Sequence, residues 1–279
     1  MDQIAPVFVS HGAPTLALRD APARRFLTGL GAVIGRPRAI VAVTAHWETA
    51  RATAGAAARP RTIHDFGRFD DALFDIAYNA PGDPALAERI SDLLCAEGIP
   101  SAVDPMRGLD HGVWVPLRLM YPDADIPVVP LSVQPAHGPA HHLQVGRALA
   151  PLTRDGVLVL GTGSFTHDLA RFRGQSQDAA VPDDVREFAD WFDAALTEGR
   201  GCDTLTYRTR APHAVEQHPT EEHLLPLFVA LGAAGPGVRA ERLHSSATFG
   251  VLRMDAYRFV PAATASASDQ AVSAVHERI

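Results

Sequence analysis

Short apolar runs alternate with amphipathic segments along most of the chain. The apolar runs predict buried strands at residues 4–10, 39–44, 126–133 and 157–160, with two further strands within 239–260. Segments whose apolar positions recur every three or four residues predict helices at 22–34, 84–97, 114–120, 139–152, 183–196 and 220–231. This alternation predicts an α/β fold, with a central, mostly parallel sheet covered by helices.

The chain reads as one domain followed by a short tail. No internal repeat and no long linker interrupts residues 1–261, so we expect a single domain over this range. Residues 262–279 are rich in Ala and Ser and lack aromatic side chains, which predicts a flexible C-terminal tail.

Three of the predicted strands lead directly into a histidine. These are His11 in SHGAP, His46 in AHWE and His167 in THDL. Ligands of open α/β sheets bind at the carboxyl ends of the strands, so the three imidazoles can converge on one site if the strands are parallel neighbours. The alternative for any one of them is an ordinary turn or surface residue.

Two further histidines stand where a helix is expected to begin. His111 follows Asp110, which could either orient an imidazole or cap the helix. His223 lies in the first turn of the helix predicted from Thr220, where the helix dipole favours neutral imidazole, the metal-binding form. We interpret Glu221 and Glu222 as compensation of the dipole rather than as metal ligands.

Composition supports imidazole chemistry and excludes several classes of protein. The 279 residues include 13 His but only 2 Cys, too few for a disulfide framework. The net charge of -7, with scattered Arg, argues against a nucleic-acid partner. No apolar run approaches the roughly 18 residues of a membrane span. The N-terminus lacks the basic region of a signal peptide, so we expect a cytoplasmic protein.

Five ordered motifs carry a resemblance to a known family. They are SHGAP, AHWE, LDHGVWVPL, GTGSFTHDL and HPTEEHLLPL, within about residues 4–259. Together they resemble the class III extradiol ring-cleavage dioxygenases, in particular the bacterial DOPA 4,5-dioxygenase-like subgroup. The resemblance implies that residues 1–261 form the catalytic domain and that the substrates are O2 and a catechol, DOPA-like or related.

The resemblance also implies roles for the five histidines. His11 and His46 match two metal ligands, and His223 stands where the protocatechuate-type branch has the carboxylate of a 2-His-1-carboxylate triad. Ring cleavage then needs Fe(II), whereas a set of three or four His also suits Zn(II) as the bound metal. His167 matches the active-site base, or a fourth ligand in a zinc form, and His111 matches the acid.

Two other functions use the same residues. A zinc-dependent hydrolase needs a similar His cluster, and a non-catalytic metal-binding protein needs only the ligands. The presence of both His111 and His167 as an acid–base pair favours an enzyme. A substrate carboxylate would call for a cation, and the candidates, each also explicable as surface charge, are Arg59, Arg61, Arg107 and Arg118.

Overall fold

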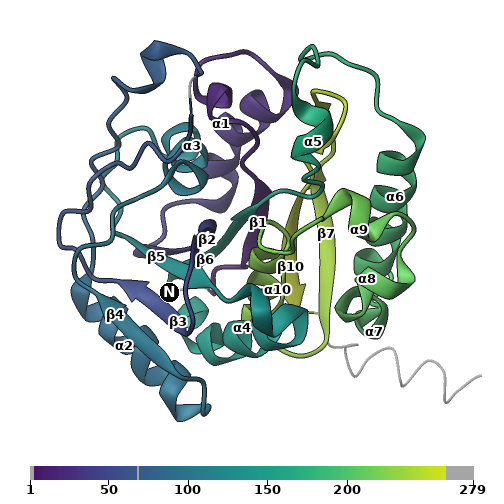
Figure 1. Cartoon of the computed structure of the whole chain (residues 1–279). Coiled ribbons are helices and arrows are strands. Elements are labelled where there is room, and N and C mark those ends of the chain that lie inside the picture. Colours follow the sequence, from purple (N-terminus) through teal and green to yellow (C-terminus); the bar gives the residue numbers. More distant parts are fainter. Residues whose placement is uncertain (1–2, 68, 262–279) are drawn as a thin grey trace, which may run out of the picture.

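An eight-stranded sheet forms the centre of the computed structural model, which describes residues 3–67 and 69–261 (Figure 1). The strand order is β4-β3-β5-β2-β6-β1-β10-β7. The four central strands are mutually parallel: β5 (Val128–Val133), β2 (Ala39–Glu48), β6 (Val157–Gly163) and β1 (Val7–Ser10). The outer strands are β4 (Ser101–Asp104), β3 (Ala52–Gly55), β10 (Ala256–Pro261) and β7 (Val238–His244). The predicted α/β fold with a mostly parallel sheet is confirmed.

Helices cover both faces of the sheet and create two apolar cores. One core packs α1 (Pro22–Ile34) and α3 (His111–Met120) against the sheet. The other contains α2 (Pro84–Ala96), α4 (Gly138–Arg154), α6 (Asp183–Thr197) and α10 (Leu225–Ala233). Burial on both faces explains why the central strands are apolar at nearly every position instead of alternating.

Short elements complete the chain between these layers. The α-helical turns are α5 (Leu169–Phe172), α7 (Gly201–Leu205), α8 (Tyr207–Arg210) and α9 (Ala214–Gln217). The 3₁₀ turns are η1 (Pro14–Ala17), η2 (Asp71–Leu73) and η3 (Pro135–His137). Of these, α5 and η1 border the site described below.

Two expectations about local structure were wrong. The helix expected over 220–231 begins at Leu225, because Pro226 has no N–H and fits only the first turn of a helix. His223 therefore lies in the turn before α10. The second strand expected within 239–260 is broken by Phe249 and Gly250, whose φ angles of 54° and 68° form the turn of a small hairpin. Its strands are β8 (Ala247–Thr248) and β9 (Leu252–Arg253).

The tail predicted for residues 262–279 lies outside the described residues. Over residues 3–67 and 69–261, none of the helices has both the length and the apolar character needed to span a membrane.

Candidate metal centre

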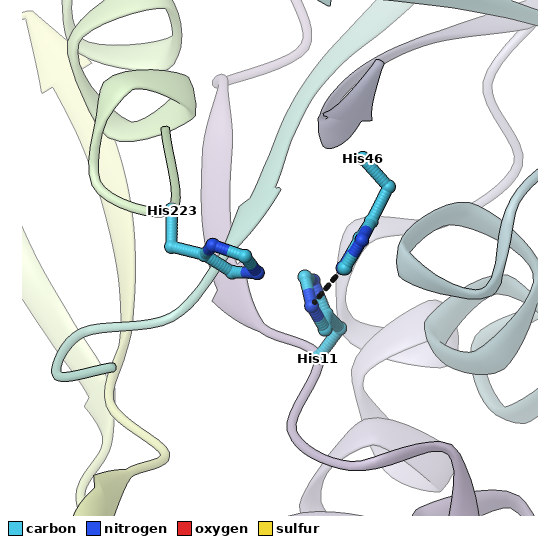
Figure 2. Close-up of side chains that lie close together, drawn as sticks. All are labelled: His11, His46 and His223. Carbon is cyan, nitrogen blue, oxygen red and sulfur yellow. Dashed lines mark hydrogen bonds between the residues drawn. The ribbon is translucent and has the colours of Figure 1, made fainter. Parts of the chain in front are cut away.

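Three imidazoles meet at the carboxyl ends of the central strands. His11 directly follows β1, His46 lies near the end of β2, and His223 comes from the turn before α10. Figure 2 shows the three rings directed toward one another from these separate elements. One nitrogen of each ring lies within 4.8 Å of the others, and the Nε2 atoms of His11 and His46 are 3.0 Å apart.

The hydrogen bonds at Nδ1 define which nitrogen of two of these rings is protonated. The Thr162 hydroxyl donates to the carbonyl of Gly112 at 2.5 Å, so it accepts from His11 Nδ1, 3.2 Å away. His223 Nδ1 donates to Glu222 Oε1 at 2.8 Å. Since a neutral imidazole carries one proton, both rings present an unprotonated Nε2. Outer partners of this kind fix the orientation of metal-binding histidines.

The free Nε2 atoms fit a cation. His223 Nε2 is buried and has no hydrogen-bond partner among the described residues, an arrangement that costs free energy unless something binds there. His46 Nδ1 lies 3.4 Å from Asp65 Oδ2, and its Nε2 faces that of His11 at 3.0 Å. A single cation can therefore be shared by these nitrogens and that of His223. Three imidazole nitrogens are a ligand set that suits Zn(II) and Fe(II).

Burial keeps these imidazoles neutral. Loss of hydration lowers the pKa of His46 to about 3, with a further contribution from His111. The same cause, reinforced by the neighbouring histidines, holds the pKa of His11 and of His223 well below the usual value of 6.5. The lone pairs are therefore available at neutral pH, without competition from protons.

Asp65 joins His46 to His111 beside the cluster. The rings of His46 and His111 have centroids 4.0 Å apart. Asp65 Oδ1 accepts from both the backbone N–H and Nδ1 of His111, at 2.9 Å each. Burial acts to raise the pKa of Asp65, but the hydrogen bonds and charge of His111, together with the charge of His46, outweigh it and bring the pKa to about 2. Sequence reasoning missed Asp65, because it stands in a loop outside the motifs.

Asp110 has neither of the roles considered from the sequence. Its carboxylate makes no side-chain cap to α3, although it is the residue before the helix. Instead its buried Oδ1 accepts from the Thr44 hydroxyl at 2.8 Å, and its Oδ2 pairs with Arg107. Asp110 thus ties the start of α3 to β2, the strand that carries His46.

His167 lies beside His223, whereas His111 lies beside His46. Its ring stacks on His223 with centroids 3.4 Å apart, and its backbone N–H donates to the carbonyl of Gln217. Burial lowers the pKa of His167 to about 4, against an opposing effect of Glu222. A ring nitrogen of His167 lies within 4.8 Å of a carboxylate oxygen of Glu222 and of a ring nitrogen of His223. Glu222, interpreted from the sequence as dipole compensation, supports these two rings.

Two glycines of β6 let the His223 turn approach the sheet. A Cβ at Gly163 would lie 2.0 Å from the carbonyl oxygen of His223, and a Cβ at Gly161 would lie 2.3 Å from that of Pro226. The same His223 carbonyl accepts from the N–H of Ser164 at 2.9 Å. The GTG segment therefore serves to place a histidine.

A pocket of about 880 Å³ opens above the cluster. Its floor consists of five histidines with two carboxylates, and the described residues there are His11, His46, His111, His167, His223, Asp65 and Glu222. Phe66, Phe69, Leu169, Phe172 and Arg173 form its walls and mouth. The described residues that line the pocket include none of the other histidines. They also include none of the arginines considered from the sequence, which are Arg59, Arg61, Arg107 and Arg118. The pocket is large enough for a single aromatic ring with a side chain.

Comparison with known proteins identifies the class to which this fold and site belong. The family model described as the catalytic LigB subunit of aromatic ring-opening dioxygenase matches residues 8–257. The chain is therefore an aromatic ring-cleaving dioxygenase, in agreement with the resemblance carried by its motifs. It belongs to the LigB family.

Similar proteins extend over nearly the whole chain. A 4,5-DOPA dioxygenase extradiol of Beta vulgaris is 43% identical over 90% of this chain and 95% of its own length. A protein of the same name from Escherichia coli K12 is 39% identical over 81% of this chain and 84% of its own length. A crystal structure of an uncharacterized protein from Escherichia coli K12 superposes with a TM-score of 0.77 at 31% identity, covering 92% and 99% of the two chains. These relatives place the chain among the extradiol enzymes.

Proposed function

We propose that this enzyme uses O2 to open the ring of a catechol, DOPA-like or related, at a metal held by His11, His46 and His223. The observation that carries the proposal is the convergence of three Nε2 atoms, at least two of them left unprotonated by their Nδ1 contacts. A metal bound there acts as a Lewis acid that lowers the pKa of the catechol oxygens, and Fe(II) adds the redox capacity that Zn(II) lacks. The names of the DOPA-cleaving relatives support the choice of a catechol.

His167 has the position of the base. It is neutral at working pH because burial lowers its pKa to about 4, so it can accept a proton from a phenol hydroxyl in the pocket. The carboxylate of Glu222 next to it would stabilise the imidazolium that forms. The stacked arrangement favours this role over that of a fourth ligand.

His111 has the position of the acid. Asp65 holds its Nδ1, which leaves Nε2 as the nitrogen available to a molecule in the pocket. A carboxylate behind an imidazole stabilises the protonated ring, so His111 can carry a proton to an oxygen of the opening ring. The proposed acid then lies beside His46 and the proposed base beside His223.

Oxygen consumption tests the proposal directly. The metal-free protein would be loaded anaerobically with Fe(II), given DOPA or another catechol, and then exposed to air. We expect oxygen uptake equal in moles to the catechol consumed, with a yellow ring-opened product. Protein loaded with Zn(II) is the matched control and should consume no oxygen. Ester or amide cleavage by the zinc form, without oxygen uptake by the iron form, would support the hydrolase alternative instead.

A further inference from the structure

Among the described residues that line the pocket, Arg173 is the cation that the proposed reaction does not use. Arg173 follows the last residue of α5 and lines the pocket with its neighbours Leu169 and Phe172. Its side chain is exposed, so it can reach a molecule that extends outward from the floor. None of the arginines considered from the sequence lines this pocket in the described part of the chain. Arg107, for example, is paired with Asp110.

Arg173 is free to bind an anion. Within residues 3–67 and 69–261, no carboxylate forms an ion pair with it and no side chain accepts a hydrogen bond from it. Arg171, two residues earlier, shows the contrast: its guanidinium is held by Asp168 at 2.6 Å and by Asp184 at 2.7 Å. One arginine of this short segment therefore stabilises the fold, and the other is presented to the pocket.

The carboxylates of the pocket are already engaged. Among the described lining residues, the acidic side chains are Asp65 and Glu222, and both lie at the floor. Asp65 accepts from His111, and Glu222 accepts from His223. Near the mouth, Asp70 borders a separate hollow that shares Phe69 with the pocket, and its carboxylate accepts from the N–H of Ala72. Among the described residues that line the pocket, the mouth thus offers apolar surface and the Arg173 guanidinium, and it has no carboxylate of its own.

We propose that Arg173 determines substrate specificity by binding a side-chain carboxylate, and that the enzyme prefers catechols whose side chain ends in a carboxylate and carries no ammonium group. This inference rests on the proposed function, because the ring must first occupy the floor of the pocket. A guanidinium binds a carboxylate through paired charged hydrogen bonds. Arg173 would repel an ammonium group, and no described carboxylate lines the mouth beside it, so an amino acid such as DOPA should be the poorer substrate.

A panel of four catechols separates charge from ring binding. Dihydroxyphenylpropionate is anionic, DOPA zwitterionic, dopamine cationic and methylcatechol uncharged. We expect the unmodified enzyme, loaded with Fe(II), to show its highest kcat/KM for dihydroxyphenylpropionate. Arg173→Gln should lower that value about tenfold, mainly through KM, and leave methylcatechol unchanged. Arg173→Glu should reverse the order and favour dopamine.

The control is Arg147→Gln, which removes an exposed arginine of α4 that does not line the pocket. It should leave all four values unchanged. An equal loss on all four catechols in Arg173→Gln, no loss on any, or a preference of the unmodified enzyme for DOPA would overturn the inference. Absence of oxygen uptake with all four would instead contradict the proposed function.

Discussion

The rings of His167 and His223 are stacked, with centroids 3.4 Å apart and planes inclined by only 13°. In a parallel stack the two rings lie face to face, so their nitrogen lone pairs lie in nearly parallel planes. The ligands of one metal ion instead direct their lone pairs at a common point from different directions. His223 does converge with His11 and His46 (Figure 2), and its ring nitrogen lies within 4.8 Å of theirs. The stack therefore distinguishes His223, which can bind a metal, from His167, which can exchange protons beside it.

Replacing each ring of the stack should give different losses. His223→Ala should remove metal and activity together, because it deletes one of the three proposed ligands. His167→Ala should retain metal while turnover falls by roughly 100-fold or more, as expected for loss of a general base. Metal content after dialysis and the rate of oxygen uptake measure the two effects. If His167→Ala loses metal as completely as His223→Ala, the fourth-ligand role is favoured.

His111→Ala should also retain metal. Its Nδ1 is bound by Asp65 and its ring lies beside His46, so the side chain contributes acidity rather than ligation in our proposal. We expect turnover to fall by roughly 100-fold or more, with metal content unchanged. Unchanged turnover in this variant would remove the acid role from His111.

Glu222→Gln should weaken metal binding without deleting a ligand. The carboxylate accepts from His223 Nδ1 at 2.8 Å, and the amide can present its nitrogen there and disturb the ring. We expect the affinity for Zn(II) or Fe(II) to fall roughly 10- to 100-fold. Glu221→Gln, one residue earlier, is the control and should bind metal more nearly as the unmodified protein does. Equal affinities in all three proteins would show that Glu222 does not support the site.

Gly163→Ala should displace the His223 turn. The added Cβ would lie 2.0 Å from the carbonyl oxygen of His223, so the backbone must move. We expect lower metal affinity together with a loss of about 1–3 kcal/mol in the free energy of unfolding. Gly29→Ala is the matched control, since a Cβ there meets nothing within 4 Å and lies in α1, where Ala is the better helix former. Metal affinity unchanged in Gly163→Ala would contradict the proposed tight approach.

The sheet and the histidine placements followed from local pattern. Buried strands are uninterrupted apolar runs, so β1, β2 and β6 and the histidines after or within them are readable from the sequence. Strands β3 and β4 were missed because their sequences, ATAG and SAVD, contain no run of large apolar residues. Neither the spacing of apolar residues nor a short motif indicates which side chains touch when their segments lie far apart in the sequence.

Two contacts across the fold illustrate this limit. Asp65 reaches His111 over 46 residues of sequence, and its loop has no pattern that indicates the contact. Arg173 stands among several arginines that look equivalent in the sequence. What distinguishes it is that Asp168 and Asp184 bind Arg171 instead, which only the three-dimensional arrangement reveals.

The buried side chain of His142, away from the candidate metal centre, should make the free energy of unfolding depend on pH. It is fully buried in α4, where Nδ1 donates to the carbonyl of Gly138 and Nε2 accepts from the N–H of Gln134. Burial lowers its pKa from 6.5 to about 4. The unfolded chain therefore takes up a proton that the folded chain does not, and the contribution of neutral His142 to stability is lost as pH falls from about 6.5 toward 4.

His142→Gln should remove this dependence. The free energy of unfolding of the unmodified protein should exceed that of the variant most at pH 7, and the difference should shrink by about 3 kcal/mol toward pH 4. Urea unfolding of the metal-free proteins at a series of pH values measures it without a contribution from metal release. His137→Gln, at an exposed position just before α4, should instead give a difference that varies much less with pH. Parallel pH curves for the unmodified protein and His142→Gln would show that the buried imidazole does not control this loss of stability.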